Sequence, residues 1–304
     1  KRRLEEGLAI NRALGNQSGV ASFVSRLSQI AWRQGRFEEA ERLAREGVAA
    51  SLETGSRTQS ALPLLHLGEV LEQVAKFSEA RSVLQQSLEL YTDLARRNYI
   101  TTARTLLGSV ALHLGRYEEA CDHVQTGLAL ARAHGPRHYT ALNLLVMGWL
   151  ELARGAPATA HPLLEESAAV YREARPKDDL ALALACLALS ARERENTLEA
   201  RQHLCHALEV AQESGAVPPL LWALPATALL LAGEGERERA VELYALASRY
   251  PLVAKSRWFA DIAGNTLTEV AAALPAERVA VLKERGRARD LEAAVRALVS
   301  ELCT

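Results

Sequence analysis

The sequence lacks the features of a membrane-spanning or secreted chain. It has no run of 18 apolar residues, and its most apolar stretch, 220–232, is interrupted by Pro225 and Thr227, so it is too short to cross a bilayer. The opening Lys-Arg-Arg-Leu-Glu-Glu is not followed by the apolar core that a signal peptide needs. We therefore predict a cytoplasmic protein with no membrane association.

Cysteine is scarce and shows no paired spacing. The chain has four cysteines and no Cys-x-x-Cys: Cys121, Cys186, Cys205 and Cys303. This usage predicts reduced thiols and not a disulfide framework. His203 and His206 would share a helical face with Cys205 nearby and could bind a metal together with Cys186. Ordinary surface and core roles are the favoured interpretation, so no metal site is predicted.

Charge and catalytic motifs are also missing. The net charge is -1, which gives no basic surface for nucleic acid. There is no Gly-x-x-x-x-Gly-Lys-Ser/Thr loop, no His-Glu-x-x-His and no Gly-x-Ser-x-Gly. We predict that the chain itself takes no cofactor, binds no nucleic acid and is not an enzyme.

The sequence does contain an internal repeat with a period of 40 residues. The motif at 35–40, Gly-Arg-Phe-Glu-Glu-Ala, recurs in similar form at 75–80 and 115–120. The final alanine persists in all units: Ala40, Ala80, Ala120, Ala160, Ala200 and Ala240. Twelve positions before this alanine every unit has a small residue: Ser28, Gly68, Gly108, Gly148, Ala188 and Ala228. Four positions after the alanine most units have a larger apolar residue: Ala44, Leu84, Val124, Leu164, Leu204 and Tyr244. Small residues let two helices approach closely while the larger ones fill the space beside them.

Apolar residues within each unit recur at helical spacing, and breaks separate a first from a second helix. The second helix is expected to end at a glycine in three units and in the chain's opening helix, namely at Gly15, Gly55, Gly135 and Gly215, where a left-handed residue closes a helix. One unit has Arg175-Pro176 instead. The sequence predicts an all-α solenoid of helix hairpins.

This pattern of small residue, large aliphatic, Gly-x-aromatic-x-x-Ala turn and second amphipathic helix resembles the tetratricopeptide repeat. The aromatic is present as Phe37, Phe77 and Tyr117, whereas Pro157, Thr197 and Arg237 replace it later. The resemblance implies a right-handed superhelix, with helices longer than in the usual repeat of about 34 residues. Armadillo and HEAT repeats are the structural alternative. We divide the chain into 1–18, the second helix of a truncated repeat; 19–254, six repeats; and 255–304, a degenerate repeat with capping helices.

The C-terminal region resembles that of bacterial signal-transduction ATPases of the STAND type and related transcriptional regulators. The residues that carry this resemblance are 256–259, Ser-Arg-Trp-Phe, and 286–295, in which Gly286 is expected to separate two helices. It implies a sensor arm that follows a nucleotide-binding domain lying N-terminal to it in the full protein. The opening residues 2–14, with Leu4, Leu8, Ile10 and Leu14, predict an open apolar edge that could self-associate.

In the resembled family ligands touch the first helix of each pair, which forms the concave face. That face is predicted to include Arg26, Gln29, Arg33, His66, Glu69, Gln73, Thr105, Ser109 and His113, followed by the more apolar Leu145, Trp149, Leu189, Trp222 and Leu229. Trp149 and Trp222 are candidate anchors for a partner. The leading hypothesis is a sensor that binds a protein, peptide or small-molecule ligand and relays binding through superhelix shape. The alternatives are a constitutive interaction scaffold and a peptide-pheromone receptor, which would need a deep, closed groove.

Overall fold

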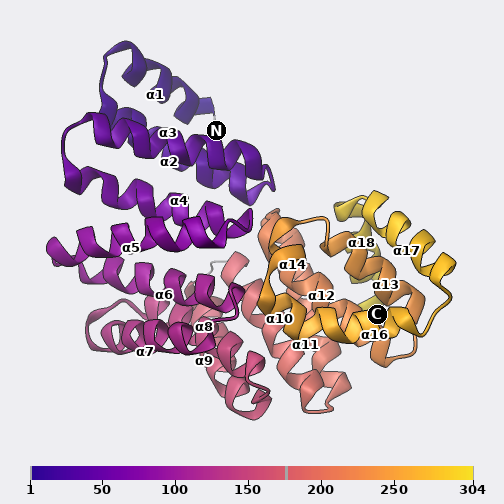
Figure 1. The fold of residues 1–304 in the computed structure, drawn as a ribbon. Helices are drawn as coiled ribbons and strands as arrows, with labels where there is room; N and C mark the ends of the chain where they lie inside the picture. The colour runs from indigo at the N-terminus through magenta and orange to yellow at the C-terminus, as the bar shows by residue number, and fades with distance from the viewer. Residues whose placement is uncertain (1, 175–176, 304) are drawn as a thin grey trace.

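The structure, a computed structural model, describes residues 2–174 and 177–303. It is 86% helix, and the described residues contain no strand. The predicted fold class is confirmed: the chain is an all-helical, tetratricopeptide-like repeat solenoid. Figure 1 shows successive helix pairs stacking from the N-terminus, with the C-terminal helices α16, α17 and α18 beside α11, α12 and α13.

The helices form an inner and an outer layer. Each inner helix contacts the next inner helix and packs against its outer partner. The inner helices are α2 (Gln17–Arg33), α4 (Ala61–Gln73), α6 (Arg97–His113), α8 (Arg137–Ala153), α10 (Lys177–Glu193) and α12 (Val217–Gly233). The outer helices are α1 (Arg2–Ala13), α3 (Phe37–Glu53), α5 (Phe77–Asp93), α7 (Tyr117–His134), α9 (Pro157–Ala174), α11 (Thr197–Ser214) and α13 (Arg237–Ala247). A short 3₁₀ turn, η1 (Arg57–Ser60), precedes α4.

The repeat columns explain why the two layers pack. All six column alanines, from Ala40 to Ala240, are at most 1% exposed. The small column meets the larger one directly: a Cβ on Gly68 would lie 2.4 Å from Leu84, and one on Gly148 would lie 2.4 Å from Leu164. The period therefore encodes the close contact between the helices of one hairpin.

The predicted helix ends are mostly confirmed. Gly15, Gly55 and Gly215 are left-handed, whereas Gly135 is not: its backbone is extended, with φ of -98°. The unit without this glycine ends at Ala95, which takes the left-handed conformation in its place. The predicted stop at Arg175-Pro176 lies outside the described residues.

The first helix is less open than its sequence suggested. Leu8 is 6% exposed and Leu4 is half-buried against the core that α2 covers, whereas Ile10 and Leu14 are 59% and 74% exposed. Leu4 and Leu8 are therefore not part of an unpaired face, because α1 turns them towards α2.

The last part of the chain folds back onto the repeats. It comprises α14 (Pro251–Lys255), α15 (Arg257–Phe259), the π-turn η2 (Ala260–Gly264), α16 (Asn265–Ala272), α17 (Ala276–Ala288) and α18 (Leu291–Leu302). The expected helix break at Gly286 is wrong. Gly286 lies inside α17, where a Cβ would be 2.1 Å from the carbonyl oxygen of Glu242 on α13, so its lack of a side chain allows close packing.

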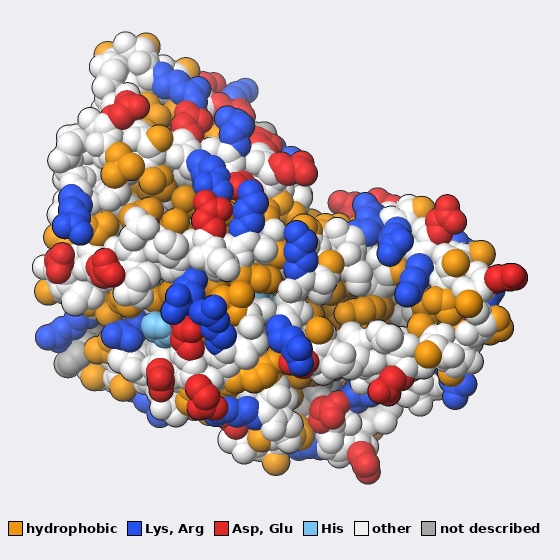
Figure 2. Space-filling model, viewed as in Figure 1, with side chains coloured by type: hydrophobic (Ala, Val, Ile, Leu, Met, Phe, Trp, Pro, Cys, Tyr) orange, Lys and Arg blue, Asp and Glu red, His pale blue; other side chains and the backbone are white. Residues whose placement is uncertain are grey.

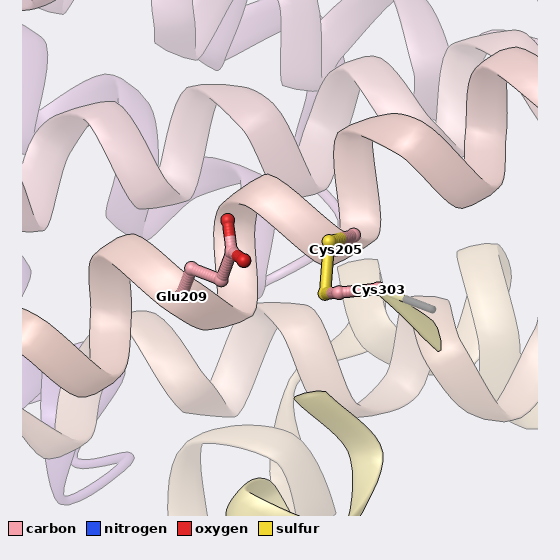
Figure 3. Close-up of side chains that lie close together, drawn as sticks. All are labelled: Cys205, Glu209 and Cys303. Atoms are coloured by element: carbon pink, nitrogen blue, oxygen red, sulfur yellow. A yellow bond between two sulfur atoms is a disulfide. The ribbon is translucent and has the colours of Figure 1, made fainter. Parts of the chain in front are cut away.

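The prediction of reduced thiols is wrong for two of the four cysteines. Cys205 on α11 and Cys303 after α18 form a disulfide (Figure 3), whereas Cys121 and Cys186 are free. This pairing could not be predicted from cysteine spacing, because the partners are 98 positions apart and meet only when α18 packs on α11. The disulfide removes the cysteine argument for a cytoplasmic location, which stays a prediction. In the described part of the chain, no helix is both long and apolar enough to cross a membrane.

Candidate functional site

The inner helices line a groove that begins with a cavity of about 720 Å³. Ser22, Ser25 and Gln29 of α2 face His66 of α4 across it, and Tyr99 of α6 completes the far wall. Nε2 of Gln29 lies 3.1 Å from Nδ1 of His66. Hydroxyl, amide and ring side chains therefore dominate this part of the groove.

A second cavity of about 530 Å³ continues along the same helices. Glu69 of α4 lines it one turn after His66, and Thr102 of α6 lines it one turn after Tyr99. Nδ1 of His66 lies 3.1 Å from Oε2 of Glu69, which connects the two cavities. Both volumes lie in the range of about 300–1,000 Å³ found for ligand sites. Together the cavities form what we call the inner groove.

The groove ends at an aromatic cluster supplied partly by the C-terminal helices. The rings of Trp149 and Trp222 stack with centroids 4.0 Å apart, and Trp258 lies 4.8 Å from Trp222. Nε1 of Trp258 donates to the carbonyl oxygen of Trp149 at 2.9 Å. Nδ1 of His113 lies 2.7 Å from Oγ of Ser256, the first residue of the Ser-Arg-Trp-Phe motif. This motif therefore closes one end of the groove.

The structure brings most of the predicted concave residues to the groove. Those lining the first cavity are Arg26, Gln29 and His66, and those lining the second are Glu69, Gln73, Thr105, Ser109 and Trp149. Arg33 lies beside the groove and pairs with Asp178, with its Nε 2.9 Å from Oδ2.

His113 and Trp222 do not line either cavity. They are 2% and 4% exposed, because α15 covers His113 and the Trp149 and Trp258 rings cover Trp222. Trp222 is therefore a core residue in this structure and not an exposed anchor. Leu145, Leu189 and Leu229 are likewise buried.

The second cavity is acidic. Three carboxylates line it, Glu69, Glu72 and Asp179, and none of its described lining residues is Lys or Arg. Glu72 is buried, accepts a hydrogen bond from Ser109 and lies 3.4 Å from Nε2 of His113. Burial, followed by repulsion from Asp178 and Glu69, raises the pKa of Asp179 to about 6.

Several polar atoms around this cavity have no hydrogen-bond partner among the described residues. They are Nε1 of Trp32, Oε1 of Gln73 and the hydroxyl of Tyr171. Tyr171 is 2% exposed, and burial together with the Asp179 charge raises its pKa well above the ordinary value. Buried polar atoms are nearly always paired in folded proteins, so their gathering around one cavity points to a site for a ligand.

Sequence reasoning missed Trp32, Tyr171 and Asp179. Trp32 comes one position before Arg33, which was placed on the concave face, and Asp179 opens the inner helix α10. Both Trp32 and Asp179 would have been predicted if the concave face had been extended to the ends of the inner helices. Tyr171 belongs to the outer helix α9, and only the packing of α9 turns it towards the cavity.

No metal centre is assigned. His203 of the candidate cluster faces a carboxylate: its Nε2 lies 3.7 Å from Oε1 of Glu199, and burial lowers the His203 pKa. Donor atoms of Cys205, Glu209 and Cys303 lie within 4.8 Å of one another (Figure 3). The two sulfur atoms are bonded to each other, so neither is the thiolate that a metal requires.

The face of the molecule drawn in Figure 2 has no large patch of charges of a single sign. Figure 2 shows Lys and Arg side chains interspersed with Asp and Glu side chains over both the repeats and the C-terminal helices. The distinctive electrostatic feature is therefore the acidic second cavity.

Comparison with known proteins identifies the family. Residues 4–93 and 99–173, more than half of the chain, match the family described as tetratricopeptide repeat. The chain belongs to the tetratricopeptide repeat family and is a protein-interaction domain. None of the curated proteins matches it.

Solved structures share the fold at low sequence identity. A Rap protein complexed with competence and sporulation factor is 16% identical, with a TM-score of 0.69, covering 94% of this chain and 76% of that one. Aspartyl phosphate phosphatase F from Bacillus subtilis is 15% identical, with a TM-score of 0.59 and coverages of 98% and 74%. BtubC from P. vanneervenii is 15% identical, with a TM-score of 0.54 and coverages of 71% and 92%. These likenesses concern the fold alone.

Proposed function

We propose that this chain is a receptor module that binds a short peptide segment in its inner groove. The observation that carries the proposal is the set of unpaired polar atoms around the second cavity. The N–H group of Trp32 matches a backbone carbonyl, and Oε1 of Gln73 matches a backbone N–H. An extended peptide offers both kinds of partner along its length.

The shape of the groove supports a peptide over a compact ligand. The two cavities run across successive inner helices, from α2 to α10, and the aromatic cluster closes one end. The Rap protein with a similar fold is complexed with competence and sporulation factor. The peptide-receptor hypothesis requires a deep, closed groove, and closure of one end by the aromatic cluster supports it.

A peptide selection with a blocked control tests the proposal. A random peptide library would be selected on the intact chain and counter-selected on Thr102→Trp, whose added ring fills the second cavity. Gln86→Trp places the same ring on the exposed face of the outer helix α5. We expect peptides that bind the chain and Gln86→Trp alike, with binding at least about tenfold weaker to Thr102→Trp, equivalent to about 1.4 kcal/mol. Equal binding to all three proteins would contradict groove recognition.

We further propose that peptide binding is relayed through superhelix shape, as in the sensor arm of a signal-transduction ATPase with a nucleotide-binding domain N-terminal to it. Contacts between repeats that are far apart in the sequence support this role. Arg33 pairs with Asp178, 145 positions away, and Gly35 lies against Val217. A ligand between these helices would alter such contacts, and small rotations add along a solenoid.

Small-angle X-ray scattering tests the relay separately from binding. We expect the selected peptide to change the radius of gyration of the chain, and the change to disappear in Thr102→Trp. Binding with an unchanged scattering profile would instead indicate a constitutive scaffold. A reading frame that encodes a nucleotide-binding domain upstream would support the ATPase context. Non-enzymatic function and cytoplasmic location stay predictions.

A further inference from the structure

The second cavity has a chemistry of its own that narrows the class of ligand. Its described lining holds three carboxylates and no Lys or Arg. Arg33, whose charge acts on Asp179, forms its ion pair with Asp178. Asp179 itself has no hydrogen bond or ion pair with any residue that the structure describes. Because Arg33 is paired with Asp178, the carboxylates of the cavity wall are complementary to a positive charge on a ligand.

Tyr171 provides an independent observation at the same place. Its side chain is 2% exposed, yet its hydroxyl has no hydrogen-bond partner among the described residues. It lines the cavity together with Asp179, and the two groups are close enough to affect each other electrostatically. A buried hydroxyl beside a carboxylate, both without partners, can accept hydrogen bonds from a charged donor.

The remaining wall of the cavity is aromatic. Trp32, Tyr139 and Trp149 line it with the carboxylates. Aromatic faces attract ammonium and guanidinium groups, most strongly where water is excluded. Carboxylates in one part of a cavity and aromatic rings in another are the groups that bind such cations in proteins.

We propose that the second cavity binds the guanidinium or ammonium group of an Arg or Lys side chain in the bound peptide. Asp179 and Glu69 accept hydrogen bonds from the cation, Tyr171 supplies a further acceptor, and the indole N–H of Trp32 donates to an adjoining peptide carbonyl. This inference rests on the proposed peptide binding and deepens it, because it names the residue type that the groove selects.

Equilibrium dialysis with defined peptide mixtures tests the inference on the intact chain. The probes are N-acetylated, C-amidated pentapeptide mixtures with a fixed central residue and randomised flanks. The central residue is Arg, Lys, citrulline, norleucine or Glu, and the bound amount is measured by mass spectrometry. Citrulline keeps the size and shape of Arg without its charge, so the comparison isolates the charge.

We expect the Arg and Lys mixtures to be retained on the order of tenfold more than the citrulline and norleucine mixtures, as charge-assisted hydrogen bonds imply. Asp179→Asn should bring retention of the Arg mixture close to that of citrulline. Tyr171→Phe should lower it less, since only one acceptor is lost. Glu89→Gln removes a carboxylate from the exposed face of the outer helix α5 and should change nothing. Circular dichroism of each variant confirms folding.

Two results would overturn the inference, and only one of them would also contradict the proposed peptide binding. Equal retention of all five mixtures, lost in Thr102→Trp, would leave peptide binding in place and refute the cation site. Retention of none of the mixtures would contradict both the cation site and the proposed function.

Discussion

Gly108 of α6 lies directly against Val124 of α7: a Cβ added to Gly108 would be 2.4 Å from Cγ2 of Val124. Val124 itself is fully buried. The two positions belong to the small and large columns of the 40-residue period, and the same contact recurs between Gly68 and Leu84. The packing of the hairpins that carry Gly68, Gly108 or Gly148 therefore depends on one missing side chain.

Substitution of Gly108 measures the strength of this contact. Gly108→Ala should lower the free energy of unfolding by about 1 kcal/mol, because overpacking costs about 1–3 kcal/mol and the gain in helix propensity, up to about 1 kcal/mol, offsets part of it. Adding Val124→Ala should relieve the clash, so the double variant should be more stable than the sum of the single effects predicts.

Gly233 is the matched control, since it lies in α12 with no atom within 4 Å of an added Cβ. Gly233→Ala should leave stability unchanged or raise it by up to about 1 kcal/mol. Similar urea denaturation midpoints for Gly108→Ala and Gly233→Ala would contradict the assigned packing.

The disulfide between Cys205 and Cys303 should stabilise the C-terminal end. Its two cysteines are separated by 98 positions, and removing a bridge across a long loop typically costs about 2–4 kcal/mol. We expect Cys303→Ser to melt at a lower temperature than the unmodified chain without reductant. Dithiothreitol should lower the melting temperature of the unmodified chain but not that of Cys303→Ser.

Cys121→Ser serves as the control, because Cys121 is a free thiol. Under denaturing, non-reducing conditions the chain should react with two equivalents of a thiol reagent, through Cys121 and Cys186. Four reactive thiols would show that the bridge is not formed.

Asp179 should make stability depend on pH. Its pKa is raised from 3.8 to about 6 by burial, followed by the charges of Asp178 and Glu69, while Arg33 opposes the shift. A carboxyl whose pKa is raised by folding stabilises the protein most when protonated, below about pH 4, and that contribution is lost as the pH rises through 6. Tyr171 of α9 and His138 of α8 also line the cavity that Asp179 faces.

Asp179→Asn should therefore be the more stable protein at neutral pH. One pKa unit corresponds to about 1.4 kcal/mol, and because solvent reaches the cavity we expect a gain of about 1–2 kcal/mol at pH 7 and almost none at pH 4. Urea denaturation of both proteins at the two pH values measures this difference. His138→Gln is the control, since it should leave the pH dependence of the Asp179→Asn effect unchanged. An equal difference at both pH values would refute the account of Asp179.

The exposed residues of α1 give a prediction about self-association. Ile10 and Leu14 are 59% and 74% exposed, so a head-to-tail contact between copies would use them and not the buried Leu8. Changing both to Glu should keep the chain monomeric at concentrations where the unmodified chain associates. Sedimentation at rising protein concentration tests this self-association. An unmodified chain that stays monomeric at every concentration would count against the contact.

The fold was predictable because its determinants are local and repeated. Positions 12 and 16 apart, such as Gly108, Ala120 and Val124, pack within one hairpin, so a single period specifies every layer. The end of the groove was not predictable in the same way. Trp149 and Trp258 meet across 109 positions and His113 and Ser256 across 143, and such contacts depend on the accumulated rotation of several repeats. The period therefore placed Trp222 on the inner face but could not show that the C-terminal helices cover it.

The central claim is that the inner groove is the binding surface, and hydrogen–deuterium exchange with a selected peptide tests it most directly. We expect added protection at the inner helices that line the second cavity, α2, α4, α6, α8 and α10, with little change in the exposed amides of α3, α5 and α7. Thr102→Trp should show no added protection at the same peptide concentration. Protection confined to the outer helices or to α1, and equal in Thr102→Trp, would contradict the claim.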